Sequence, residues 1–175
     1  MADLRRIVIV GGGTSGWLSA AYLAKHFIIP SKGKIEVTLI ESSDIGTIGV
    51  GEATIPGIRD TLQDLGLSEK AFMKSCNATF KQAIKFVDWL KLPEDGKHHQ
   101  YYHNFSVPLK VGHEEYAPYW VLDRESLGKD YAYASTIQGQ LCDHSLAPKM
   151  PDDKEYGGPL HYAYHFDAGL FAKFL

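Results

Sequence analysis

Two lysines, Lys81 and Lys85, are the residues of this chain that most directly suggest chemistry. They lie in the stretch CNATFKQAIKFVDWLK, which alternates apolar and polar side chains and therefore predicts one β-strand within Cys76 to Lys91. Both lysines then point to the same face. From spacing alone they are ordinary charges on a wet face or a protected edge. The alternative is that one amine is held over a substrate, where an amine can donate a hydrogen bond or act as a nucleophile.

A glycine-rich turn near the N-terminus predicts a dinucleotide site. A β-branched run from Ile7 to Val10 is typical of a central parallel strand buried on both faces, and WLSAAYLAKHF further on has the composition of a helix. Between them the G-x-G-x-x-G spacing is formed by Gly11, Gly13 and Gly16. Such glycines allow a tight turn, close approach to a pyrophosphate and close helix packing, and the helix N-terminus favours phosphates. A turn that only packs is the simpler alternative.

Two later segments extend this site. The segment KIEVTLIES reads as a second strand and ends in Glu41, 25 residues beyond Gly16. A carboxylate there can accept hydrogen bonds from both ribose hydroxyls, and it disfavours a 2′-phosphate. The next segment, SSDIGTIGVGEATIPGIRD, places glycines around Glu52, so its backbone can lie against a flat ligand such as a flavin ring. A plain surface loop is the alternative, although Val50 is too apolar for a fully solvated turn.

Size, charge and cysteine content restrict the class of protein. The chain has 175 residues, 45% of them hydrophobic and 22% charged, as in an ordinary globular domain. A formal charge of -3 gives no support for binding to nucleic acid or to an anionic membrane surface. No apolar run approaches transmembrane length. Two cysteines outside any CxxC pattern indicate neither a disulfide framework nor a zinc ribbon, so a cytoplasmic location is expected.

The remainder of the chain has a less regular pattern. Over residues 91–159 the sequence pattern becomes irregular and is rich in aromatic and histidine residues, which suits an aromatic substrate pocket or an aromatic core equally well. A zinc site is disfavoured, because no second cluster has ligand spacing. N-caps at Ser68 and Asp167 predict two short helices. The second runs to Leu175 after only two strands of a parallel sheet, so a longer protein is expected.

These segments together resemble one known family, the flavin-dependent tryptophan halogenases. The matching stretches, in the family's order, are GGGTSGW, GVGEATIP, CNATFKQAIKF, YHNF and YAYHFDA. The resemblance implies an α/β fold: an FAD-binding Rossmann-type module, like that of flavin monooxygenases, with inserted substrate-module segments and a truncated C-terminal side. Residues 1–175 would be the N-terminal part of one domain, with a dinucleotide-binding unit near 7–80 and a substrate-module segment near 81–160.

The resemblance also implies a reaction. A separate flavin reductase would supply FADH2, and dioxygen with a halide, chloride or bromide, would give hypohalous acid. A lysine beside the substrate would hold this acid or capture its halogen, and the halogen would add to tryptophan or another indole. A homodimer is expected for the full-length protein, and neither a nucleic-acid partner, a membrane nor a metal is expected.

The family pattern assigns roles to particular residues. It selects Lys81 as catalytic and leaves Lys85 as a solvated charge. The expected FAD-binding residues are Gly11, Gly13, Thr14, Ser15, Gly16, Glu41, Val50, Glu52 and Ala53. The expected substrate-binding residues are His103, Phe105, Ile55 and Pro56. Because the family's W-x-W-x-I-P motif and catalytic glutamate lie beyond residue 175, the chain alone is not expected to halogenate. A generic FAD-dependent monooxygenase or oxidoreductase, or a non-catalytic FAD-binding fragment, are the alternatives.

Overall fold

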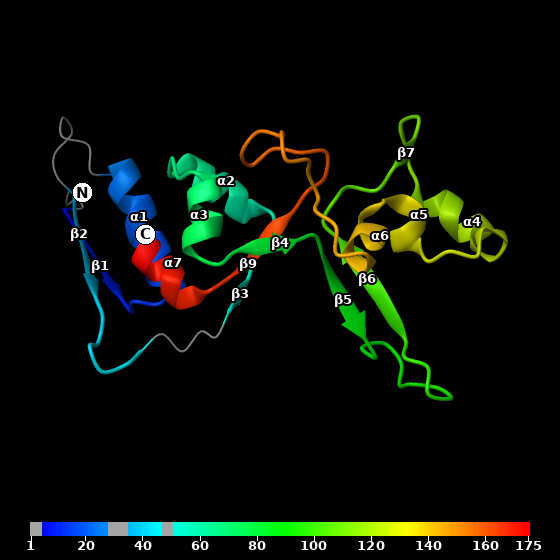
Figure 1. The fold of residues 1–175 in the computed structure, drawn as a ribbon, viewed down its shortest axis with the longest axis horizontal. Helices are drawn as coiled ribbons and strands as arrows, with labels where there is room; N and C mark the ends of the chain where they lie inside the picture. Colours follow the sequence, from blue (N-terminus) through cyan, green and yellow to red (C-terminus); the bar gives the residue numbers. More distant parts are fainter. Residues whose placement is uncertain (1–4, 28–34, 47–50) are drawn as a thin grey trace. The chain divides into compact units, whose positions relative to one another are not determined.

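The computed structural model describes residues 5–27, 35–46 and 51–175, which form two compact units. Unit 1 comprises Met1–Thr79 and Tyr164–Leu175, and unit 2 comprises Phe80–Ala163 (Figure 1). Across the described ranges, none of the helices has the length and apolar character needed to span a membrane. Each unit has its own elements and its own buried side chains.

A two-stranded parallel sheet begins unit 1. Strand β1 (Arg6–Val10) pairs with β2 (Glu36–Ile40), and α1 (Thr14–Phe27) contacts both strands. The predicted order of strand, glycine turn, helix and strand is therefore confirmed. The expectation that β1 is buried on both faces is wrong for the described residues, because Val8 and Val10 are 57% and 83% exposed. Burial alternates along both strands, as it does in a sheet that is covered on one face.

A second sheet has the strand order β3-β9-β4. Its strands are β3 (Glu52–Ala53), β4 (Thr79–Lys81) and β9 (Ala163–Phe166). Strand β9 is antiparallel to β3, with Glu52 opposite Phe166. The boundaries between the two units fall inside β4 and β9, so the chain passes from one unit to the other within neighbouring strands of this sheet.

Three short helices complete unit 1, namely α2 (Gly57–Asp64), α3 (Glu69–Ser75) and α7 (Ala168–Phe174). Ser68 caps α3 by accepting a hydrogen bond from the backbone N–H of Ala71 at 3.3 Å. Asp167 caps α7 in the same way, at 2.8 Å from the backbone N–H of Leu170. Both predicted N-caps are confirmed, because a cap depends on residues only three positions apart.

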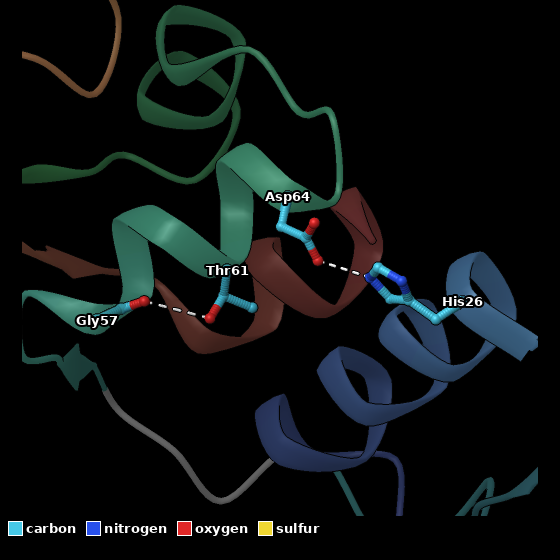
Figure 2. Close-up of polar contacts among 4 residues, drawn as sticks. All are labelled: His26, Gly57, Thr61 and Asp64. Atoms are coloured by element: carbon cyan, nitrogen blue, oxygen red, sulfur yellow. Dashed lines mark hydrogen bonds and ion pairs between the residues drawn. The ribbon is translucent and has the colours of Figure 1, made fainter.

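One polar contact joins helices α1 and α2, and Figure 2 shows it together with a hydrogen bond inside α2. His26, in the last turn of α1, lies with Nε2 2.6 Å from Oδ2 of Asp64, the last residue of α2. Within α2, the hydroxyl of Thr61 donates to the carbonyl of Gly57 at 3.2 Å. The contact between His26 and Asp64 ties the helix that follows the glycine turn to the helix that follows β3.

Phe72 of α3 is the centre of the buried aromatic core of unit 1. It is fully buried and makes edge-on contacts with the rings of Tyr164, Phe166 and Phe171, at centroid distances of 5.0, 5.5 and 5.6 Å. The Tyr164 hydroxyl also donates to the buried carboxyl group of Glu69 at 2.6 Å, so this buried polar group has a hydrogen-bond partner. Aromatic packing therefore links α3, β9 and α7.

We expect Phe72→Ala to lower the free energy of unfolding by about 3–5 kcal/mol, because it removes a fully buried ring and leaves a cavity. Urea unfolding followed by circular dichroism measures this loss. The matched control is Phe27→Ala, the same change at a half-exposed position in α1, which should cost less than about 1.5 kcal/mol. Equal losses in both variants would contradict the central position of Phe72.

Unit 2 is built on an antiparallel hairpin. Strand β5 (Ala83–Val87) pairs with β6 (Gln100–Asn104), and Lys85 lies opposite Tyr102. The later elements are β7 (Lys110–Val111), β8 (Glu114–Glu115), α4 (Ala117–Leu127), α5 (Tyr131–Ser135) and α6 (Gln138–Asp143). The irregular sequence pattern over 91–159 therefore includes several short strands and helices that it did not reveal. Most of these elements are too short to show a period, and α4 buries none of its residues.

The prediction of one continuous strand within Cys76 to Lys91 is also wrong, because the structure has two shorter strands there. The interruption is at Gln82, which separates β4 from β5. Gln82 is only 7% exposed. Its side-chain amide N–H donates to the backbone carbonyl of Leu146 at 2.6 Å, and its backbone carbonyl accepts from the backbone N–H of Phe105 at 3.0 Å. Because β4 pairs with β9 and β5 pairs with β6, the two lysines belong to different sheets. Alternation no longer requires them to share a face.

Candidate active site

The glycine turn opens onto a pocket of about 670 Å³ in unit 1. The predicted FAD-binding residues that line it are Gly11, Gly13, Thr14, Glu41 and Glu52. They come from the carboxyl ends of β1 and β2, the start of α1 and the strand β3. This is the place where an open parallel sheet binds a dinucleotide, because backbone N–H groups and the helix N-terminus face the phosphates there.

The other predicted FAD-binding residues have different positions. Ser15 and Gly16 lie in the first turn of α1 but do not line this pocket. Ala53 lines a neighbouring pocket of about 360 Å³, which also includes Glu52 and Asp167. Val50 lies outside the described residues.

The glycines of the turn differ in what surrounds them. Gly11 has a φ of +116°, a conformation that side chains rarely adopt. A Cβ on Gly16 would overlap the carbonyl oxygen of Gly11, whereas a Cβ on Gly13 would meet nothing within 4 Å. Gly12, to which the sequence assigned no role, leaves no room for a Cβ against the Glu41 carboxylate. The turn thus has a backbone bend that requires glycine at Gly11, close packing at Gly16 and open space beside Gly13. This combination fits a pyrophosphate site.

Two of the pocket residues are bonded to each other. The Thr14 hydroxyl donates to Oε1 of Glu52 at 2.9 Å, although the two residues are 38 positions apart. The bond joins the first residue of α1 to β3. A ligand in the pocket would therefore meet these two side chains as a fixed pair.

Lys81 lies in unit 2 at the end of β4, and its side chain is half-buried. Its Nζ is 5.4 Å from the centroid of the Phe105 ring. Burial lowers the pKa of this amine below its ordinary value, because desolvation disfavours the ammonium form. The hydrogen bond from the N–H of Phe105 to the carbonyl of Gln82 holds the two segments together. The structure thus brings together a predicted catalytic residue and a predicted substrate residue.

The other predicted substrate residues are less closely grouped. His103 is exposed on β6, where it lies opposite Ile84. Ile55 and Pro56 belong to unit 1, where Ile55 is exposed and Pro56 is the N-cap residue of α2. The substrate set is therefore divided between the two units.

Lys85 has surroundings that the sequence did not indicate. Its Nζ lies 3.8 Å from Oδ1 of Asp143 and 5.0 Å from the centroid of the Tyr102 ring. The hydroxyls of Tyr102 and Tyr133 both donate to the Asp143 carboxylate, at 2.8 and 2.6 Å. Lys85 is exposed and lies near the carboxylate of Asp143, whereas Nζ of Lys81 lies over the ring of Phe105. No local motif could have identified Asp143, since it is 41 positions from Tyr102.

The hydrogen bonds of this cluster change the acidity of its members. Those from Tyr133 and Tyr102 hold the pKa of Asp143 below its ordinary value, because they stabilise the carboxylate. Burial, together with the bond to Asp143, raises the pKa of Tyr133 to about 12 and also raises that of Tyr102. Both phenols therefore remain hydrogen-bond donors at neutral pH, and they join the hairpin and α5 to α6.

We expect Asp143→Asn to destabilise the protein by no more than about 1 kcal/mol at pH 7, because the carboxylate is partly exposed and its interactions are screened. The folded-state pKa of Asp143 lies below its unfolded value of 3.8. The stabilisation is therefore present above that pH and is lost as the pH falls through the folded-state pKa. Thermal unfolding between pH 3 and 7 measures the difference. The control, Asp152→Asn, makes the same substitution at an exposed position and should change the stability at pH 7 by less than about 0.5 kcal/mol.

Comparison with known proteins places the chain in a family. Residues 6–175 match the family model described as tryptophan halogenase. The chain belongs to the tryptophan halogenase family. It is 39% identical to tryptophan 7-halogenase RebH of Lentzea aerocolonigenes, an alignment that covers 97% of this chain and 33% of RebH. It is 36% identical to tryptophan 6-halogenase SttH of Streptomyces toxytricini, covering 97% of this chain and 34% of SttH.

Solved structures of tryptophan halogenases and flavin-dependent halogenases have the same fold. A tryptophan halogenase from Shewanella frigidimarina matches with a TM-score of 0.85 and 37% identity, over 98% of this chain and 33% of that one. Xcc4156, a flavin-dependent halogenase from Xanthomonas campestris, matches with a TM-score of 0.78 and 33% identity, over 99% of this chain and 32% of that one. The family and the α/β fold class that the sequence indicated are confirmed. The chain spans about a third of the length of these relatives in the tryptophan halogenase family.

Proposed function

We propose that the protein containing this chain halogenates tryptophan or another indole, using FADH2, dioxygen and chloride or bromide. One observation carries the proposal: a half-buried amine of lowered pKa, Lys81, lies beside an aromatic ring in a chain of the tryptophan halogenase family. The proposal concerns the whole protein, because the chain spans only a third of its relatives' length.

The pocket at the glycine turn fits the nucleotide half of FAD. The open space beside Gly13 lets the backbone approach a pyrophosphate, and Glu41 offers a carboxylate to the ribose hydroxyls. The pair of Thr14 and Glu52, with Ala53, would lie on the flavin side of the site. Bound reduced FAD would supply, with dioxygen, the oxidising equivalent that converts a halide ion to hypohalous acid. A flavin reductase is the proposed source of FADH2.

Lys81 would then control the halogen at its Nζ atom. As an ammonium it donates a hydrogen bond to the oxygen of hypohalous acid, which makes the halogen more electrophilic. As a neutral amine it forms a nitrogen–halogen bond, while the oxygen leaves as water with the proton from nitrogen. Burial increases the neutral fraction at a given pH because it lowers the amine pKa. In either form the halogen passes to an indole carbon, which releases its proton.

Phe105 and His103 would position the indole. The ring of Phe105 offers a flat apolar surface next to Lys81, and His103 adds a polar edge on the preceding strand. Such positioning keeps the reacting carbon near the amine, which is worth orders of magnitude in rate.

The test is an assay of the longest natural polypeptide that contains this chain. With FAD, a flavin reductase, dioxygen, bromide and an indole, we expect a product whose mass spectrum carries the paired isotope peaks of bromine. An oxygenated product without bromine would overturn the proposal in favour of a monooxygenase. FAD binding without any product would overturn it in favour of a non-catalytic FAD-binding protein.

A further inference from the structure

Three side-chain amides of unit 2 restrain the short segment that carries Phe105. They belong to Gln82, Asn104 and Gln138, and each forms a hydrogen bond to a backbone atom that is distant in the sequence. Gln82 is 7% exposed and Gln138 is fully buried. Because hydrogen bonds are directional, a buried amide that joins two segments fixes their relative position.

The residue after Phe105 is held by Gln138 in a closed set of hydrogen bonds. The backbone N–H of Ser106 donates to Oε1 of Gln138 at 2.7 Å, and Nε2 of Gln138 donates to the carbonyl of His161 at 2.5 Å. The backbone N–H of His161 donates in turn to Oγ of Ser106 at 2.9 Å. These bonds join the segment after β6, the start of α6 and the segment before β9.

The residue before Phe105 is held by its own side chain. The amide of Asn104, the last residue of β6, donates to the carbonyl of Ala132 at 2.8 Å and to Oγ1 of Thr136 at 2.7 Å. Ala132 lies in α5, and Thr136 directly follows that helix. The end of β6 is therefore fixed against α5.

Phe105 itself is bonded to the segment that carries Lys81. Its backbone N–H donates to the backbone carbonyl of Gln82 at 3.0 Å, and Gln82 directly follows Lys81 in the chain. The Gln82 side chain is held by its bond to the carbonyl of Leu146 at 2.6 Å. Nζ of Lys81 lies 5.4 Å from the centroid of the Phe105 ring. The backbones that carry the amine and the ring are therefore restrained relative to each other.

We infer that Gln82, Asn104 and Gln138 are positioning residues: they fix the backbone of Phe105, and with it the ring, relative to Nζ of Lys81, and thereby select the indole carbon that receives the halogen. The inference rests on the proposed function, in which the indole lies against Phe105. Neighbouring carbons of an indole ring are one bond length apart, so a small movement of Phe105 would present a different carbon to the amine. A misplacement of about 1 Å can also cost about 100-fold in rate.

The amide group suits this role because it carries no charge. It can both donate and accept hydrogen bonds, and Gln138 does so with the two ends of its side chain. A carboxylate or an ammonium in the same place would add a charge close to the reacting amine and change its pKa. Neutral amides restrain Phe105 without that effect.

The first test measures the ring isomers that the longest natural polypeptide forms on bromination of L-tryptophan and of unsubstituted indole. The variants are Gln138→Met and Asn104→Leu, which keep the approximate size of the side chain and remove its hydrogen bonds. We expect the ratio of the main isomer to the other isomers, determined by proton NMR of the products, to fall at least about threefold in each variant. The matched control is Gln100→Met, the same change as at Gln138 but at an exposed position of β6, and it should keep the wild-type ratio.

The second test requires no reaction. Hydrogen exchange of the peptide that contains residues 104–107, followed by mass spectrometry, reports the backbone N–H groups of Phe105 and Ser106. We expect their exchange to be at least about tenfold faster in Gln138→Met and Asn104→Leu, because the restraints on the segment are lost. Exchange in Gln100→Met should equal that of the wild type.

Wild-type isomer ratios in both Gln138→Met and Asn104→Leu would overturn the inference, and so would unchanged hydrogen exchange in both. A lower rate with an unchanged isomer ratio would overturn it too, because a general structural loss has that effect. If Gln138→Met does not fold, Asn104→Leu decides, since Asn104 is only half-buried. If the wild-type protein brominates neither probe, the proposed function fails and the inference with it. If it brominates a probe and the variants keep its isomer ratio, only the inference fails.

Discussion

Lys81→Ala should lower the rate of indole bromination at least about 100-fold, whereas Lys85→Ala should lower it less than about threefold. The two lysines are close in sequence, but their surroundings differ. Lys81 lies over the Phe105 ring with a lowered pKa, and Lys85 lies near the carboxylate of Asp143. Only Lys81 therefore has the desolvated amine that the proposed halogen transfer requires. Single-turnover rates of product formation, with saturating FADH2 and bromide, measure the difference.

Two further measurements make the comparison decisive. Hypohalous acid should still form in Lys81→Ala, and a halogen-accepting reporter such as monochlorodimedone should detect it. If Lys81→Ala and Lys85→Ala lose activity equally, the effect is structural and the assignment of Lys81 is wrong. Lys81→Arg separates the two modes of transfer, because arginine keeps the charge but cannot become a neutral amine. Retained activity in this variant would indicate hydrogen bonding rather than nitrogen–halogen bonding.

The pH dependence of the reaction follows from the direction of the pKa shift. Burial moves the pKa of Lys81 below 10.5, so the neutral amine is more abundant at a given pH than in an ordinary lysine. If transfer uses the neutral amine, the rate should rise with pH and level off above the folded-state pKa. The same burial disfavours folding while the amine is charged, so this unfavourable contribution is relieved as the pH rises through the folded-state pKa.

Gly16→Ala is expected to lower FAD affinity at least about 100-fold and to destabilise the protein even without FAD. The added Cβ would overlap the carbonyl oxygen of Gly11, so the turn between β1 and α1 must move. Overpacking of this kind costs about 1–3 kcal/mol in stability. Flavin fluorescence titration and thermal unfolding of the flavin-free protein measure the two effects.

Gly13→Ala is the control that separates binding from folding. A Cβ at Gly13 would meet nothing within 4 Å, so the flavin-free protein should unfold at the wild-type temperature. The methyl group would nevertheless enter the nucleotide pocket, because Gly13 lines it, and FAD affinity should fall. An unchanged unfolding temperature for Gly16→Ala would contradict the packing role of that glycine.

Features that depend on neighbouring residues could be predicted from the sequence. The spacing of Gly11 and Gly13 indicated a nucleotide turn, and both residues line the pocket at the end of β1. The caps at Ser68 and Asp167 depend on contacts three residues away. The strand, turn and helix order follows from local composition in the same way. Local patterns were thus sufficient for much of unit 1.

Features that depend on distant residues could not be predicted. The interruption at Gln82 follows from a hydrogen bond to Leu146, 64 positions away. The partner of Lys85 is Asp143, which no local pattern connects with it. The absence of a side chain at Gly12 matters only because Glu41 lies against it. In each case the contact joins residues that are far apart in the sequence and meet only in the folded chain. Periodicity and motif spacing therefore cannot predict it.

The position of the boundary between the units has an evolutionary consequence. Unit 2 begins inside β4 and ends inside β9, and because these strands are neighbours in one sheet, the two ends of unit 2 are adjacent. Segments with adjacent ends can be exchanged between proteins with little disturbance of the host. A recombination event at this boundary would transfer Lys81 and Phe105 together, while the glycine turn stayed in place. A new substrate specificity could therefore be acquired as one inserted segment that includes the amine proposed to react.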